Sequence, residues 1–309
     1  MSALPREPSA LLRRLPLVTL YLSERCNSRC TTCDYWRHGR ADLDLAAVSR
    51  LLPSLRRLGT ETVLLSGGEP LLNREWADIA SLLAGEGLEI WLLTSGLSLA
   101  KHADRAARLF RTITVSLDGT DPATYAAIRG VDAFDVVCKG IRAAAAAGVR
   151  VTVRVTLQRA NFRQLASFVD LTRELGAQQV SFLAVDVANP HAFARQNGFD
   201  SDLALHPAEL AELEGLISAL ERERADAFSC GFIAENPRKL RRILQYFSAV
   251  CGLGGYPPVR CNAPEFSAVV DAQGRVSPCF FIAGPSDLRV RDGLDRALNH
   301  ADMEALRSA

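Results

Sequence analysis

No apolar run in this chain approaches the roughly 20 residues that a membrane-spanning helix needs. The first fifteen residues hold three arginines but no uninterrupted apolar core, so they do not look like a secretory signal. An excess of one charge is also missing, because 36 Lys and Arg residues balance 35 Asp and Glu residues for a formal net charge of +1. Such a balance gives no indication of a nucleic-acid or anionic-membrane surface. These absences predict a cytoplasmic protein with neither nucleic acid nor membrane as partner.

Histidine is scarce, with 5 residues, whereas the chain has 8 cysteines. Without a secretory signal, cysteines in this number are typical of metal ligands rather than disulfides. Cys26, Cys30 and Cys33 have the spacing C-x3-C-x2-C. Three thiolates this close can hold three irons of a [4Fe–4S] cluster and leave the fourth iron without a protein ligand. A structural zinc site is the alternative, but zinc usually takes four ligands, and His38 is the only local candidate for the fourth.

A second motif, Gly67-Gly68-Glu69-Pro70, follows an apolar run and precedes an amphipathic helical pattern. The two motifs, one strand–helix unit apart, together resemble the radical SAM superfamily. The resemblance implies a cluster with an open iron that binds S-adenosylmethionine (SAM). Reductive cleavage of SAM then gives a 5′-deoxyadenosyl radical, which abstracts a hydrogen from a substrate C–H bond. In that family a GGE-type stretch meets the SAM amino group, which fits because glycines allow close backbone approach and a carboxylate pairs with an ammonium group.

Short apolar runs alternate with helical patterns over the first 186 residues, which is typical of a parallel α/β fold. We expect strands at 17–22, 62–66, 89–93, 112–117, 150–156 and 179–185, and helices at 44–57, 75–86, 98–110, 133–147 and 161–175. Six such units are too few for a closed eight-stranded barrel. They fit the partial (β/α)6 TIM-like barrel that the resemblance implies, in which chemistry collects at the carboxyl ends of the strands.

The expected domains follow from this pattern. We place an N-terminal extension at 1–16, the radical SAM barrel at 17–186, a helical insertion or linker at 187–260, and a small α+β cluster-binding extension at 261–309. Within the insertion, one helix is expected from about Pro207 to Ala225 and a second, basic one from about Pro237 to Val250.

Polar residues at other strand ends are candidates for contacts with SAM. By resemblance, Ser116 and Arg154 look like groups that hold its ribose and carboxylate, and Arg129 is a rival for the carboxylate. Ser95 closes the third strand at the same rim. Arg154 is an unusual charge inside a strand that is expected to be buried on both faces. Each of these residues could instead be a cap or a rim charge in water, and Asp118 could cap the turn after the fourth strand.

A second group of cysteines lies near the C-terminus. Cys261 and Cys279 bracket a strand, a turn at Gly274 and a returning strand. This C-x12-G-x4-C arrangement resembles the opening half of the SPASM domain, which binds an auxiliary [4Fe–4S] cluster in related enzymes. No cysteine follows Cys279, so it resembles the shortened, twitch-type version. Related proteins often have a further ligand near the position of Cys251, and Cys230 is either a fourth ligand or a free thiol that donates hydrogen.

The resemblance leaves the reaction open. Electron loss to a closed auxiliary cluster would give oxidation, whereas hydrogen return from a thiol would give epimerisation. The first strand begins near residue 17 and leaves no room for a peptide-recognition domain, so we expect a small natural-product substrate such as a sugar or polyol. Candidate substrate contacts are Asp186, Asn189, His191 and Glu265.

Two alternatives to this substrate remain. The first is modification of a ribosomally made peptide, because a recognition domain can be a separate protein. The second is a non-catalytic metal-binding scaffold, which the GGEP motif disfavours because a scaffold has no use for an amino-acid cofactor site. An electron donor such as flavodoxin or ferredoxin is an expected partner of the enzyme.

Overall fold

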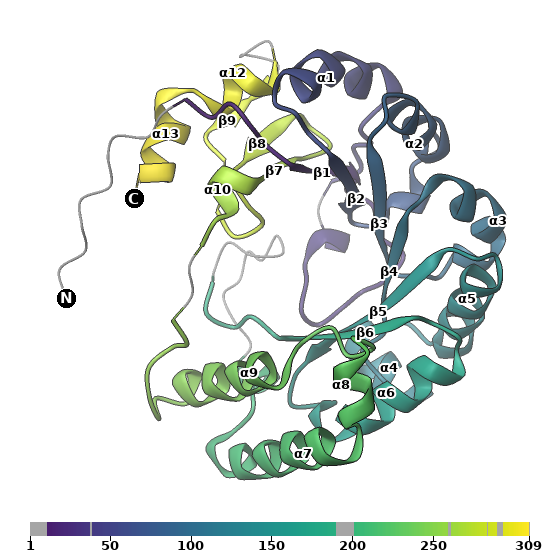
Figure 1. Ribbon diagram of the computed structural model, residues 1–309, viewed down its shortest axis with the longest axis vertical. Coiled ribbons are helices and arrows are strands. Elements are labelled where there is room, and N and C mark those ends of the chain that lie inside the picture. Colours follow the sequence, from purple (N-terminus) through teal and green to yellow (C-terminus); the bar gives the residue numbers. More distant parts are fainter. Residues whose placement is uncertain are drawn as a thin grey trace. The chain divides into compact units, whose positions relative to one another are not determined.

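The computed structural model describes residues 11–37, 39–189, 201–258, 261–282, 284–288 and 293–308 (Figure 1). His38 and His191, candidates for a zinc ligand and a substrate contact, lie outside the described residues. The chain divides into two compact units. The first unit comprises residues 1–25, 38–92 and 260–309, and the second comprises residues 26–37 and 93–259. Each unit is described by itself below.

The first unit is built on parallel strands in the order β3-β2-β1-β7. These strands are β1 (Leu17–Ser23), β2 (Thr62–Gly67), β3 (Glu89–Thr94) and β7 (Ser267–Val270). Val18, Leu20 and Leu22 lie on one face of β1 and have no exposed surface, and Thr19 on the opposite face is 1% exposed, as expected for a strand covered on both faces. Beyond β7 the sheet continues with antiparallel β8 (Arg275–Ser277) and β9 (Ser286–Asp287).

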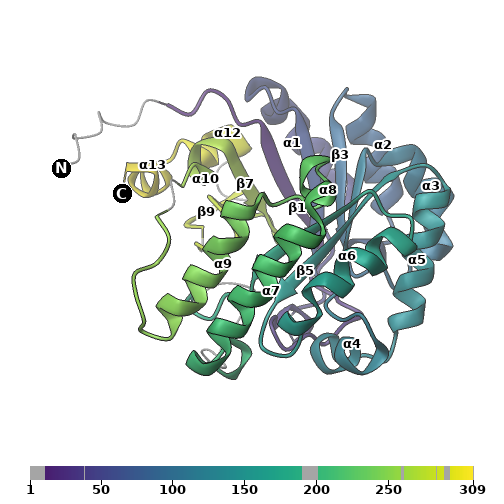
Figure 2. The same ribbon diagram turned by 60° about the horizontal axis from the view of Figure 1, so that its bottom comes forward.

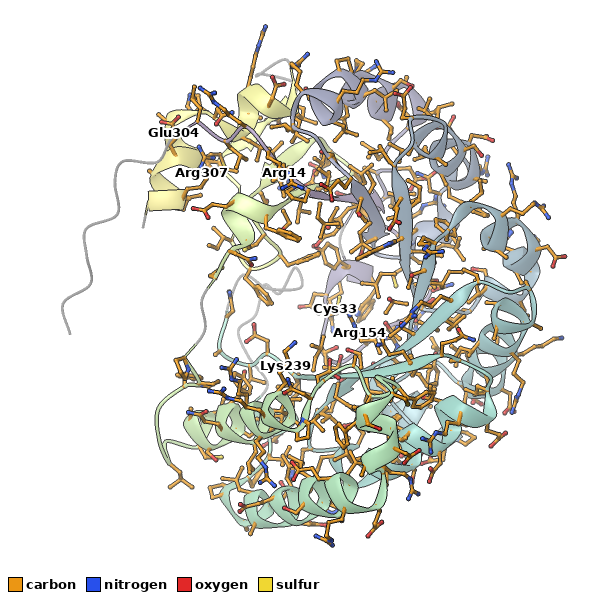
Figure 3. The ribbon with its side chains drawn as sticks, viewed as in Figure 1. Arg14, Cys33, Arg154, Lys239, Glu304 and Arg307 are labelled. Carbon is orange, nitrogen blue, oxygen red and sulfur yellow. The ribbon has the colours of Figure 1, made fainter. Side chains whose placement is uncertain are left out.

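The second unit contains three parallel strands, β4 (Thr112–Ser116), β5 (Arg150–Leu157) and β6 (Gln179–Ala184), with β5 in the middle. Three valines of β5 are fully buried, and β-branched side chains of this kind favour a pleated, packed strand. Arg154 also lies on β5, and it points to the inner side of the strands (Figure 3). All six strands expected in the barrel are therefore present, and the parallel α/β class is confirmed.

Helices cover these strands. The first unit contains α1 (Leu45–Arg57), α2 (Trp76–Gly85), α10 (Ala263–Phe266), α12 (Leu294–Leu298), α13 (Ala301–Ser308) and the 3-10 turn η2 (Pro70–Leu72). The second unit contains α3 (Leu99–Leu109), α4 (Pro122–Arg129), α5 (Phe134–Ala146), α6 (Leu165–Glu174), α7 (Leu210–Glu223), α8 (Ala225–Ser229) and α9 (Pro237–Val250), with the 3-10 turns η1 (Tyr35–Arg37), η3 (Phe162–Gln164), η5 (Ser201–Leu203) and η6 (Pro207–Glu209). In the second unit α6 packs on β6, and α7 packs on both α6 and α9 (Figure 2).

The sequence did not predict α4, which is short but strongly delimited. The side chain of Asp121 accepts a hydrogen bond from Thr124 N, Pro122 occupies the first turn, and Gly130 ends the helix in a left-handed conformation. This helix matters because its last turn contacts the cysteine loop. Among the described residues, no helix has the length and apolar character needed to cross a membrane.

Candidate metal centre

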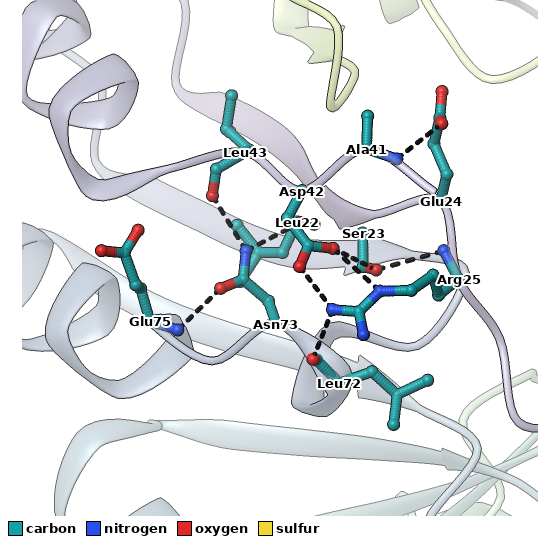
Figure 4. A network of polar contacts seen from close by, with 10 residues as sticks. All are labelled: Leu22, Ser23, Glu24, Arg25, Ala41, Asp42, Leu43, Leu72, Asn73 and Glu75. Atoms are coloured by element: carbon teal, nitrogen blue, oxygen red, sulfur yellow. Dashed lines mark hydrogen bonds and ion pairs between the residues drawn. The ribbon is translucent and has the colours of Figure 1, made fainter. Parts of the chain in front are cut away.

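The segment that leads from β1 into the cysteine loop is fixed by a polar network in the first unit (Figure 4). Ser23 Oγ donates to Asp42 Oδ1 at 2.6 Å, and the guanidinium of Arg25 forms an ion pair with the same carboxylate. Arg25 Nη2 also donates to the carbonyl oxygen of Leu72 at 2.7 Å. Asn73 Nδ2 donates to Leu22 O at 2.8 Å. Residues 22–25, which directly precede Cys26, are therefore held in place by several side chains.

The Gly67-Gly68-Glu69-Pro70 turn packs directly on that segment. Gly68 N donates to Ser23 O and Glu69 N donates to Arg25 O, each at 2.8 Å. A Cβ on Gly68 would lie only 2.3 Å from Arg25 O, and one on Gly67, where φ is +114°, would lie 2.7 Å from Ser23 O. The close approach that these glycines allow is thus an approach to the chain's own backbone at Ser23 and Arg25, shortly before Cys26.

Glu69 is fully buried, an unusual position for a carboxylate. Its Oε1 accepts a hydrogen bond from Leu71 N at 3.0 Å, which caps the turn η2. Pro70 follows at the first position of that turn and is itself buried. The GGEP motif is therefore a rigid strand-to-turn connection that carries a buried carboxylate.

In the second unit, the cysteine loop is attached to the last turn of α4. Arg29 N donates to Arg129 O at 2.9 Å, and Thr31 N donates to Ile128 O at 3.0 Å. Gly130 has φ of +68°, and a Cβ there would lie 2.3 Å from Arg29 O. The loop between the first and third cysteines is consequently held by main-chain contacts that involve no sulfur atom.

The three thiols of this loop are partly buried. Ser28 N donates to Cys26 Sγ at 3.5 Å. Burial raises the pKa of Cys33 to about 12, so its thiolate needs a cation as partner. No three His, Cys, Asp or Glu side chains within the described residues come together around a single metal ion. Each thiolate of a cube ligates a different iron, so a cluster does not require the three sulfurs to meet at one point.

Ser116 and Arg154, two of the residues expected to contact SAM, lie on adjacent strands of the second unit. Arg154 is opposite Ser116 of β4 and Ser181 of β6. Its Nε is buried and has no hydrogen-bond partner among the described residues. Burial lowers the pKa of Arg154, and Glu235 partly opposes this shift. Such a cation is suited to an anionic ligand.

Ser95 is also buried, and its Oγ donates to Asn27 Oδ1 at 2.9 Å. Ser95 therefore contacts the cysteine loop itself. Arg129, the rival candidate for the SAM carboxylate, is buried and forms an ion pair with Asp118.

The later cysteines are distributed over both units. In the first unit, Cys261 is exposed, whereas Cys279 is partly buried and its Sγ accepts from Phe281 N at 3.4 Å. The strand–turn–strand expected between them is present as β7 and β8. In the second unit, Cys251 ends α9 and its Sγ donates to Leu205 O at 3.2 Å.

Cys230 lies near the amino-terminal end of β6, whereas the candidate SAM contacts are expected at the carboxyl ends of the strands. It follows α8, and the next residues run beside the start of β6, where Gln179 Nε2 donates to Gly231 O and Val180 N donates to Phe232 O. The rim is formed by the carboxyl ends of the strands. This placement gives no support for Cys230 as a ligand or hydrogen donor, and we assign it no role.

The structure gives no support for a substrate role of the remaining candidates, Asp186 and Glu265. Asp186 Oδ1 accepts from Ala188 N at 2.8 Å and from Asn189 N at 3.1 Å, so it stabilises its own turn. Glu265 lies in the short helix α10.

Comparison with known proteins agrees with this geometry. Residues 20–172 match the model of the Radical SAM superfamily. The chain is 31% identical over 291 residues to a GTP 3′,8-cyclase of Mycolicibacterium smegmatis, which covers 89% of this chain and 78% of that protein. It is 32% identical over 166 residues to the PqqA peptide cyclase of Streptomyces rochei, which covers 52% of this chain and 45% of that protein. The chain therefore belongs to the radical SAM superfamily, whose members bind a [4Fe–4S] cluster and SAM.

A solved structure shows the same fold. The crystal structure of Streptococcus suis SuiB bound to the precursor peptide SuiA superimposes with a TM-score of 0.69 at 14% sequence identity, covering 97% of this chain and 68% of that one. This likeness confirms the expected partial-barrel architecture. The family match and the sequence identity to the GTP 3′,8-cyclase confirm the expected function at the level of a radical SAM enzyme.

Proposed function

We propose that this enzyme modifies a ribosomally made peptide. The relatives reported above are named for a nucleotide or for peptides, and they give no support to the sugar or polyol that we expected from the sequence. Similarity to the PqqA peptide cyclase supports a peptide substrate. The fold neighbour SuiB was solved with a precursor peptide.

The structural observation that carries this proposal is an apolar surface beside Cys279. Phe280, Phe281 and Ile282 follow this cysteine directly and are each more than 40% exposed. The ring of Phe280 stacks on Tyr21 of β1, with 6.1 Å between ring centroids. Large exposed apolar side chains of this kind typically mark contact surfaces. They suit the side chains of a peptide better than the hydroxyl groups of a sugar or the charges of a triphosphate.

We assign the ligands of two iron–sulfur clusters to cysteines described above. Cys26, Cys30 and Cys33 would hold the first cluster, and Cys261 and Cys279, together with Cys251, would ligate an auxiliary one. The bound cluster and SAM supply a carbon radical that removes hydrogen from a substrate C–H bond.

The groups proposed to hold SAM differ in charge. The Glu69 carboxylate is assigned to the SAM amino group, and the Arg154 guanidinium, whose Nε has no hydrogen-bond partner among the described residues, is assigned to its carboxylate. Ser116 is assigned to the SAM ribose, and Ser95 is a further polar contact at the carboxyl ends of the strands.

The substrate proposal is tested with the full chain after anaerobic reconstitution. The protein is incubated with SAM, a reductant and the short peptides encoded beside its gene, and mass spectrometry follows both 5′-deoxyadenosine and the peptide. We expect peptide-dependent formation of 5′-deoxyadenosine and a changed peptide mass, such as the loss of two hydrogens in a crosslink. GTP is the comparison substrate, because the chain is 31% identical to the GTP 3′,8-cyclase in an alignment that covers 89% of it. A nucleotide is therefore the second candidate. GTP-dependent turnover with no change in any peptide would contradict the proposal.

Glu69→Gln should weaken SAM binding while leaving the iron content unchanged. The amide keeps an oxygen that accepts from Leu71 N but loses the charge that pairs with an ammonium group. Loss of a charge-assisted hydrogen bond costs about 1.5–3 kcal/mol, or roughly ten- to hundredfold in affinity. Equilibrium dialysis of SAM measures this effect.

Glu75→Gln is the matched control. Glu75 Oε2 also accepts from a backbone amide, Leu45 N at 2.9 Å, but no part of the proposed SAM site includes it. Equal SAM affinity in wild type and Glu69→Gln would show that the amino group is held elsewhere.

A further inference from the structure

Arg129, the last residue of α4, is a buried cation with incomplete pairing. Its side chain is 11% exposed, and Nη1 donates to Asp118 Oδ2 at 3.1 Å. Its Nε is buried and has no hydrogen-bond partner among the described residues. Burying a guanidinium is costly unless its donors are satisfied. Arg129 is therefore paired with one carboxylate, whereas its Nε–H donor has no acceptor among the described residues.

Asp118 is itself firmly held, so it fixes the position of Arg129. Its Oδ1 accepts from Thr156 N at 2.7 Å, and Asn161 Nδ2 donates to the carbonyl oxygen of Asp118 at 3.0 Å. Asp118 is 2% exposed and Asn161 is fully buried. These contacts join the end of β4 to the end of β5.

The guanidinium lies in the electrostatic field of the cysteine loop. The backbone of α4 contacts both residues that flank Cys30, through Arg29 N and Thr31 N. Burial raises the pKa of Cys30, Arg129 lowers it, and Asp118 raises it less strongly than Arg129 lowers it. Burial alone would lower the pKa of Arg129, but Cys30, Asp118 and Tyr125 together raise it, so the guanidinium stays charged.

We propose that Arg129, held by Asp118, is a positioning residue that stabilises the reduced state of the iron–sulfur cluster on the cysteine loop. This inference rests on the proposed cluster ligands but not on the proposed substrate. Three thiolates around a core of charge 2+ leave one net negative charge, and reduction adds a second. A buried positive charge nearby favours that extra electron, because charges interact strongly where water is excluded. Asp118 acts in the opposite direction.

Removing the charge of Arg129 and removing the charge of Asp118 should therefore shift the reduction potential of the cluster in opposite directions. Arg129→Gln should lower the ratio of reduced to oxidised cluster about tenfold at a fixed potential, which corresponds to 59 mV for a one-electron couple. Asp118→Asn should raise this ratio. The measurement is an EPR-monitored redox titration of the anaerobically reconstituted full chain, following the signal that changes when SAM is added. Iron content is measured for every variant.

Arg224→Gln is the matched control, because Arg224 also pairs with a carboxylate, Asp170, through two hydrogen bonds in the same unit. It should leave the ratio unchanged. Opposite shifts in the two test variants support the proposal, and unchanged ratios or shifts of the same sign overturn it. If Arg129→Gln does not load a cluster, the result for Asp118→Asn alone decides. A wild-type chain that loads no SAM-sensitive cluster would instead refute the ligand assignment, and the inference with it.

Discussion

Replacing Cys26, Cys30 and Cys33 together with Ala should remove about half of the iron and abolish SAM cleavage. Two [4Fe–4S] clusters require about eight irons per chain, and the triple variant keeps only the proposed auxiliary cluster. Iron and sulfide analysis after anaerobic reconstitution, with chromatographic detection of 5′-deoxyadenosine, measures both effects. SAM cleavage by the triple variant would disprove the assignment of these ligands.

Two further comparisons separate the clusters from the other cysteines. Cys138→Ala is the control, because Cys138 is buried in α5 and is outside both proposed ligand sets; it should keep all of the iron. A wild-type chain that never exceeds about four irons would remove the auxiliary cluster from the proposal.

Gly68→Ala should damage both the fold and SAM cleavage, although it adds only one methyl group. The new Cβ would lie 2.3 Å from the carbonyl oxygen and 2.8 Å from the carbonyl carbon of Arg25, so one of the two backbone segments must move. Overpacking of this kind typically costs about 1–3 kcal/mol. Arg25 directly precedes Cys26, so the displacement also reaches the first proposed ligand. Denaturant unfolding and the SAM cleavage assay measure the two consequences.

Gly85→Ala is its control. Gly85 is the last residue of α2, and an added Cβ would meet no atom within 4 Å. In a helix, Ala is more favourable than Gly by up to about 1 kcal/mol. This variant should therefore unfold at an equal or higher denaturant concentration than wild type. If both variants behaved alike, the contact with Arg25 would have no importance.

The strands could be predicted from the sequence because short apolar runs indicate buried strands. Val18, Leu20 and Leu22 of β1 and the three valines of β5 are fully buried, and short apolar runs of this kind are typical of strands covered on both faces. The helix α4 was missed because its eight residues give only a short periodic signal. Its boundaries are nevertheless encoded by Asp121, Pro122 and Gly130, which are capping residues.

The site was harder to predict, because several roles depend on contacts between distant segments. The sequence identified the glycines of the GGEP motif by their freedom to approach a ligand, whereas the space beside them is filled by Ser23 O and Arg25 O. It suggested Arg129 as a rival to Arg154 for the SAM carboxylate, but the pairing of Arg129 with Asp118 depends on the path of α4. The position of Cys230 depends on the pairing of residues 231–234 with β6, which its spacing in the sequence does not reveal.

The main-chain hydrogen bonds from Arg29 and Thr31 to α4 have a consequence for how the protein is loaded. Small zinc domains fold only as they bind their metal, because nothing else orders the ligand loop. Here the loop has a scaffold that does not depend on iron. These two hydrogen bonds therefore contribute to ordering the loop independently of the iron. Destruction of the cluster by oxygen should leave a folded chain that can be refilled, so repair in the cell would need no round of unfolding.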